Sequence, residues 1–167
     1  HRIPQNGGPT TLGLQKIDSW LGDSKWDVIH FNWGLHDLCY RHPDSKTQGH
    51  RDKDNGTISV PPAQYEKNLE TLVKQLEQTN ATLIWATTTP VPEGEAGRVV
   101  GDDLKYNEVA KKIMQKHNIK INDLHQLATG FEAPLWAGPG NVHFKPAGSQ
   151  KLAQQVAREI KAALAEN

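Results

Sequence analysis

Residues 26–38 read WDVIHFNWGLHDL, and this stretch predicts a buried β-strand that leads directly into a polar loop. The apolar residues of its first half form a nearly continuous run, which is typical of a strand covered on both faces. Two further runs rich in β-branched and apolar residues predict strands at 82–87 (TLIWAT) and 119–121. The sequence therefore predicts at least three strands.

Helices are predicted around these strands. Apolar residues recur at helical spacing in four stretches: residues 10–21, a stretch beginning near Pro62, the stretch that holds residues 106–114, and a last one beginning near Ala147. Thr10 or Thr11 is expected to cap the first helix, and the polar residues 41–60 are expected to form a long loop. Because strands and helices alternate, the sequence predicts an α/β sandwich with a parallel sheet between layers of helices.

The composition narrows the classes of partner. The 167 residues suffice for one domain, and 19 Lys and Arg balance 19 Asp and Glu. The balanced charge gives no reason to expect nucleic acid or an anionic membrane as a partner. No apolar run approaches the roughly 20 residues of a membrane-spanning helix. The single cysteine, Cys39, has no second cysteine to pair with, so it does not identify the compartment.

Candidate functional residues follow the strands. In open α/β sheets, ligands bind beyond the carboxyl ends of the strands. Three segments are expected there, and they read NWGLHDL at 32–38, TTPVP at 88–92 and NVHFKPAG at 141–148. The first and third contain histidines, His36 and His143, which are suited to proton transfer near neutral pH.

These motifs resemble a known family. GLHDL after a strand and VHFKPAG before a C-terminal helix are similar to the third and fifth sequence blocks of SGNH (GDSL-like) hydrolases, and NGGPTT at 6–11 resembles the second. The resemblance implies a flavodoxin-like αβα sandwich that hydrolyses esters through an acyl-enzyme, without a cofactor or a metal. It assigns His143 as the general base and the amide of Gly8 as an oxyanion-hole donor. His36 stands where the family has an oxyanion-hole asparagine, and a neutral imidazole can donate the same hydrogen bond.

The chain also departs from the family pattern. The family's catalytic acid stands three residues before the histidine, where this chain has Gly140; Asn141 is expected to orient the ring instead. The first family block, a strand ending in the nucleophile motif Gly-Asp-Ser, has no counterpart. Gly-Asp-Ser does occur at 22–24, but there it follows a predicted helix and precedes the first strand, so we expect a turn at the opposite end of the sheet.

The nucleophile is therefore expected outside residues 1–167, with two further strands. Strand 27–33 has the apolar character of a sheet interior and should not form an exposed edge. We expect it to pair with an upstream stretch of the same polypeptide or with a second fragment, and we expect residues 1–167 alone to be inactive.

Three functions remain open at this point. The first is an esterase for small-acyl or carbohydrate esters. The second is a degenerate, non-catalytic module that binds a ligand such as a glycan. The third, a metal-dependent hydrolase built on His36, Asp37 and His143, is disfavoured because no second carboxylate cluster follows a strand. Asp37 is instead expected to play a structural part in its turn.

Overall fold

A three-stranded parallel sheet forms the centre of the protein. The computed structural model describes residues 1–44 and 50–166. The strands are β1 (Val28–Phe31), β4 (Thr82–Ala86) and β5 (Lys120–Asn122), in the order β1-β4-β5. Both pairings are parallel, as the alternation of strands and helices predicted. All three strands therefore end at the same edge of the sheet.

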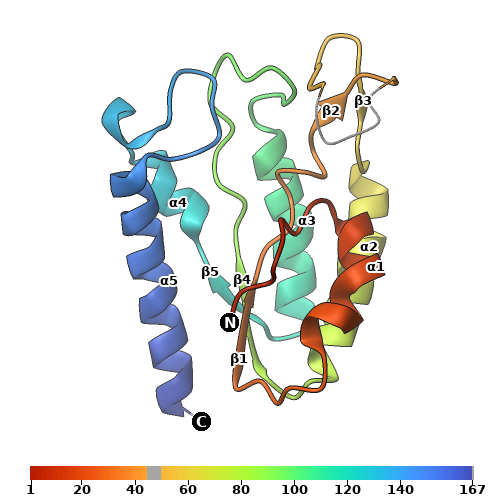
Figure 1. Ribbon diagram of the computed structural model, residues 1–167, viewed down its shortest axis with the longest axis vertical. Helices are drawn as coiled ribbons and strands as arrows, with labels where there is room; N and C mark the ends of the chain where they lie inside the picture. The colour runs from red at the N-terminus through yellow and green to blue at the C-terminus, as the bar shows by residue number, and fades with distance from the viewer. Residues whose placement is uncertain (45–49, 167) are drawn as a thin grey trace.

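Helices cover both faces of this sheet (Figure 1). The structure contains α1 (Thr10–Leu21), α2 (Pro62–Glu77), α3 (Asp102–Lys116), α4 (Leu124–Thr129), the short 3-10 helix η1 (Ala133–Leu135) and α5 (Pro146–Glu166). α1, α2 and α3 lie together on one side, and α5 packs along β1, β4 and β5 on the other. The predicted α/β class and the four long helices are confirmed, whereas α4 and η1 were not predicted.

The periodicity of the sequence explains the main core. The buried stripe of α2 recurs every three or four residues and comprises Tyr65, Leu69, Leu72, Val73 and Leu76. These side chains pack with Phe31, Leu83 and Trp85, which project from the same face of the sheet. Since burying one such aliphatic side chain contributes about 1.5–3 kcal/mol, this layer is a main source of stability.

Two sequence-based predictions of local structure were wrong. The stretch 41–60 is not one long loop, because β2 (Tyr40–Arg41) and β3 (Thr57–Ile58) pair antiparallel within and beside it; residues 45–49 lie outside the described residues. Strands of two residues show no periodicity that a sequence pattern can reveal. Neither Thr10 nor Thr11 caps α1 either, since Pro9 precedes the helix and offers no side-chain cap.

β1 forms an edge of the sheet. Among the described residues it pairs only with β4, and its other edge has no strand partner. A cavity of about 400 Å³ lies beside it, lined by β1 together with residues of α1 and of the segment 1–4. The ring of His1 meets that of Trp26 edge-on in the same region, with centroids 5.3 Å apart.

Within the described chain, no helix has the length and apolar character needed to cross a bilayer.

Candidate active site

A cleft of about 440 Å³ lies at the carboxyl ends of the strands. All four residues that the sequence singled out, Gly8, His36, Asn141 and His143, line it. They come from three separate segments: Gly8 precedes α1, His36 follows β1, and the other two precede α5. The structure therefore brings the four together, as expected where parallel strands end.

The hydrogen bonds of His143 define its tautomer. Its backbone N–H lies 3.0 Å from Oδ1 of Asn141, and its ring Nδ1 lies 2.8 Å from the same atom. A backbone N–H can only donate, so the atom facing it must be the amide oxygen and not the nitrogen. Nδ1 of His143 must then carry the proton, because it also faces an acceptor. In the neutral ring, Nε2 then keeps its lone pair, which is the state that a general base requires.

The geometry at Gly140 explains why the family's acid is absent there. Gly140 has φ +63°, a conformation that side chains rarely adopt. A Cβ at this position would lie 2.4 Å from the carbonyl oxygen of Gly94. An aspartate therefore cannot replace Gly140 unless the backbone moves, and the ring of His143 instead meets the side chain of Asn141.

His36 is a neutral imidazole at the wall of the cleft. Burial, and to a smaller extent the positive charges of Arg98 and Arg41, lower its pKa from 6.5 to about 4. Its Nδ1 is buried and has no hydrogen-bond partner within the described residues. Because a buried N–H without an acceptor is rarer than a buried acceptor without a donor, the favoured tautomer has its proton on Nε2. That N–H is the donor an oxyanion hole needs.

The backbone amide of Gly8 already donates a hydrogen bond within the protein. Gly8 is buried with φ +60°, a conformation open to glycine, and its N–H donates to Oδ1 of Asn6 at 2.9 Å. A substrate oxygen that used this amide would have to displace the side chain of Asn6. The sequence did not indicate this contact.

Asp37 connects two of the segments that line the cleft. Its Oδ1 accepts hydrogen bonds from the backbone N–H of Thr10 at 2.8 Å and from the Thr10 hydroxyl at 2.5 Å. Its role is structural, as expected, but its partner lies 27 residues away at the start of α1 instead of in its own turn. Asp37 thereby supplies the α1 cap that Thr10 and Thr11 do not provide, and it joins the loop of His36 to the loop of Gly8.

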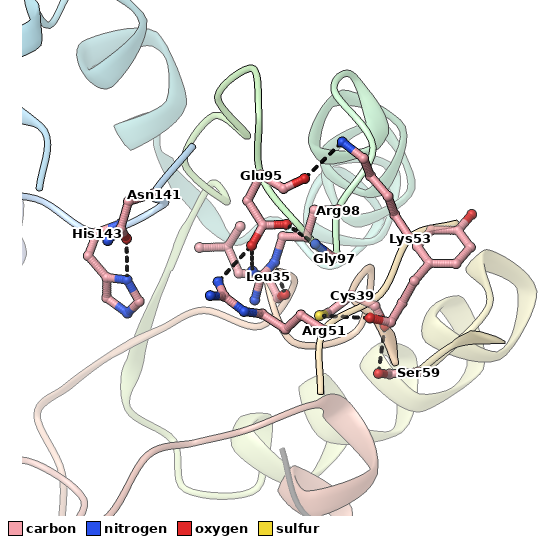
Figure 2. Close-up of polar contacts among 11 residues, drawn as sticks. Leu35, Cys39, Arg51, Lys53, Ser59, Glu95, Gly97, Arg98, Asn141 and His143 are labelled. Carbon is pink, nitrogen blue, oxygen red and sulfur yellow. Dashed lines mark hydrogen bonds and ion pairs between the residues drawn. The ribbon is translucent and has the colours of Figure 1, made fainter. Parts of the chain in front are cut away.

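The sequence analysis missed a group of arginines in the cleft. Arg41, Arg51 and Arg98 line it together with the predicted residues. The last two bind the fully buried carboxylate of Glu95 (Figure 2). Arg51 and Glu95 are 44 residues apart and share no motif, so only the folded chain reveals their pairing.

The cleft also differs from a complete serine-hydrolase site or a metal site. None of its lining residues in the described chain carries a hydroxyl or a thiol. Ser24 follows the C-terminal end of α1 and precedes β1, so it lies toward the amino ends of the strands. Over residues 1–44 and 50–166, no three His, Cys, Asp or Glu side chains gather in a way that could hold a metal ion.

Comparison with known families identifies the chain. The model of the GDSL-like lipase/acylhydrolase family matches residues 5–151. The chain belongs to this family. Membership in the GDSL-like lipase/acylhydrolase family confirms the resemblance drawn from the three motifs, and it makes the chain a member of a family of ester hydrolases. No curated protein matches the sequence.

Solved structures show the same GDSL-like fold. An acetyl xylan esterase, AlAXEase, superposes with a TM-score of 0.73 at 16% identity, over 93% of this chain and 78% of that chain. A lipase/acylhydrolase from Enterococcus faecalis gives a TM-score of 0.70 at 21% identity, over 93% of this chain and 72% of that chain. An acetylxylan esterase from Geobacillus stearothermophilus gives a TM-score of 0.68 at 21% identity, over 93% of this chain and 68% of that chain. At these identities the likeness establishes the fold alone.

Proposed function

We propose that the protein hydrolyses small-acyl or carbohydrate esters through an acyl-enzyme, with a nucleophilic serine contributed from outside residues 1–167. The observation that carries the proposal is the pairing of His143 with Asn141, which places the proton of the neutral ring on Nδ1 and leaves Nε2 to accept one in the cleft. A neutral histidine held in this tautomer is suited to take the proton of an attacking hydroxyl.

The cleft residues divide the reaction between them. Nε2 of His143 accepts the serine proton while the serine oxygen attacks the ester carbonyl carbon. The N–H at Nε2 of His36 donates to the oxyanion that forms, and the amide of Gly8 adds a second bond once Asn6 is displaced. The imidazolium of His143 then protonates the leaving alcohol. Water attacks the acyl-enzyme by the same route and releases the acid.

Asn141 makes this base weaker than that of a complete triad. Its amide oxygen orients the ring, but a neutral amide stabilises the imidazolium less than a carboxylate does. We therefore expect turnover below that of an enzyme with an aspartate in this role.

The edge of β1 is the place where the serine would enter. Gly7, Asn32 and Trp33 line both the cavity beside β1 and the catalytic cleft, so the two spaces adjoin. A strand that paired with β1 in parallel would end level with Asn32, at the rim of the cleft. The residue after such a strand would face the base. The first three residues of β1 are only half-buried, and a strand paired along this edge would cover them.

The substrate class rests on two lines of support. Two of the similar structures are acetyl xylan esterases, which remove acetyl groups from a polysaccharide according to their names. The open cleft, walled by polar and charged side chains, suits a hydrophilic substrate better than a long acyl chain. Acetylated sugars are thus the first substrates to test.

Serine-directed labelling tests the proposal. The natural polypeptide is treated with a fluorophosphonate, and the modified residue is located by peptide mass spectrometry. We expect a labelled serine outside residues 1–167, and labelling should fall when acetylated xylooligosaccharide is added. Modification of Ser24, or of no serine at all in a protein that still hydrolyses esters, would contradict the mechanism.

Two observations favour the non-catalytic alternative. The amide of Gly8 is satisfied by Asn6, and the family's acid position is a glycine that no side chain fits. A degenerate module that binds a glycan would show both features. Saturable binding of xylooligosaccharide without any ester turnover or serine labelling would favour it.

A further inference from the structure

The wall of the cleft is positively charged. Arg41, Arg51 and Arg98 line it, while no aspartate or glutamate of the described residues does. The carboxylate of Glu95, which pairs with Arg51 and Arg98, has no exposed surface. Arg51 and Arg98 share this one carboxylate, so the three groups together keep one positive charge.

Glu95 holds both of its arginines in place. Its Oε1 accepts from Nη1 of Arg51 at 2.7 Å and from Nη1 of Arg98 at 3.0 Å. Its Oε2 accepts from the backbone N–H of Gly97 at 2.7 Å. Nε of Arg98 also donates to the carbonyl of Leu35 at 2.7 Å. These bonds restrict the guanidinium groups to fixed positions, which reduces the entropy lost when a ligand binds.

The backbone around the arginines is equally fixed. Tyr40 N–H donates to the carbonyl of Gly97 at 2.7 Å, and Lys53 N–H donates to that of Ala96 at 3.0 Å. A Cβ on Gly97 would lie 2.5 Å from Cβ of Arg51, so only glycine permits this close approach. These contacts hold the segments around residues 40, 52 and 96 together as one wall of the cleft.

The wall faces the reacting groups. Figure 2 shows the guanidinium of Arg51 directed toward the side of the cleft that holds His143 and Asn141. Arg98 binds the carbonyl of Leu35, the residue before His36, so the wall is joined to the loop of the proposed oxyanion donor. A group bound by the arginines would lie close to the scissile ester.

We propose that the preferred substrate is an ester of an acidic sugar, whose oxyanion binds to Arg51 beside the ester group. The inference rests on the proposed function and specifies its substrate class. A guanidinium matches a carboxylate or sulfate with two parallel hydrogen bonds, and such charge-assisted bonds are about twice as strong as neutral ones. Nη1 of Arg51 is committed to Glu95, while its side chain remains 43% exposed. The exposed part of the guanidinium is available to a ligand.

Binding measurements without turnover test this proposal. Methyl glucuronoside and methyl glucoside differ in a carboxylate and carry no ester, so calorimetry on the intact protein compares them directly. We expect the glucuronoside to bind at least about tenfold more tightly, and Arg51→Gln to remove most of that preference. Arg158→Gln, on the exposed face of α5 and outside the cleft, is the matched control and should keep it.

Equal binding of the two sugars, or an undiminished preference in a folded Arg51→Gln protein, would overturn the proposal. If Arg51→Gln does not fold, Arg51→Lys keeps the charge and should retain part of the preference. Competition by inorganic sulfate would show that the oxyanion alone is recognised; glucuronoside binding without sulfate competition would narrow the class to carboxylates. These readouts need no catalysis, so an absence of esterase activity in the serine-bearing polypeptide would refute the proposed function and leave the charge preference as a separate result.

Discussion

Oδ1 of Asp37 lies 2.8 Å from the backbone nitrogen of Thr10 and joins the two loops that carry the proposed oxyanion donors. The carboxylate is fully buried, and its Oδ2 has no partner among the residues described. Asp37 follows His36, and Thr10 stands two residues after Gly8, so this contact sets the spacing of both donors. Burial of the same carboxyl group makes the stability of the fold depend on pH.

Asp37→Asn should remove a pH dependence of unfolding. Burial raises the pKa of Asp37 from 3.8 to about 6 in the folded protein. The folded state then binds the proton more tightly than the unfolded state, so the stabilisation is complete below about pH 3.8 and is lost as pH rises through about 6. The shift corresponds to about 3 kcal/mol. Chemical denaturation measures the free energy of unfolding from pH 4 to 7. In the native protein this free energy should contain a contribution that falls as pH rises, and the variant should lack that contribution. An identical pH profile for the two proteins would disprove this role.

His36→Asn should retain activity that His36→Ala loses. An asparagine amide can donate to the oxyanion from the same position, whereas alanine cannot, and loss of one such donor costs about 100- to 1000-fold in kcat. The pKa of His36 is lowered to about 4, so its contribution to stability is present above pH 6.5 and is lost as pH falls through about 4. Steady-state kinetics of both variants at pH 7 checks the assignment. Comparable losses in the two would mean that His36 donates no bond to the reacting oxygen.

Asn141→Asp should raise turnover, and Gly140→Asp should not. A carboxylate at 141 would face Nδ1 of His143 where the amide oxygen now lies, 2.8 Å away, and would stabilise the imidazolium. A side chain at 140 would collide with the carbonyl of Gly94, so that variant should lose stability without gaining a triad. Asn141→Ala should show a milder loss than removal of His143. A rise in kcat for Gly140→Asp would contradict this geometry.

Glu95→Ala should destabilise the protein by about 3 kcal/mol or more, because it leaves the buried guanidinium of Arg98 without its partner. Arg51→Gln should cost less, since Glu95 keeps its bonds to Arg98 and Gly97. Urea denaturation of both variants measures the difference. If the two substitutions cost the same, Glu95 does not hold the wall together as the structure suggests.

The contrast between what the sequence revealed and what it did not has a physical basis. The apolar run around Ile29 and the stripe on α2 predicted the sheet and its helices, because core burial imposes a period on the chain. His143 and His36 were found because they stand in motifs at strand ends. The bonds of Asp37 to Thr10 and of Glu95 to Arg51 were not predicted, since each joins residues 27 or more positions apart. The short β2 and β3 strands were missed because two residues show no period, and β2 is held by its pairing with β3 and by the bond from Tyr40 N–H to the carbonyl of Gly97.

The central claim, that His143 is the general base for a serine beyond residues 1–167, is tested most directly by the kinetics of His143→Ala. The measurement compares p-nitrophenyl acetate hydrolysis by the serine-bearing polypeptide, by His143→Ala and by His117→Ala, whose histidine pairs with Glu70 and Glu77 at the far end of α3. We predict that His143→Ala lowers kcat by several orders of magnitude while its thermal unfolding is unchanged, and that His117→Ala stays active. Near-normal turnover by His143→Ala, or ester hydrolysis by residues 1–167 alone, would contradict the account.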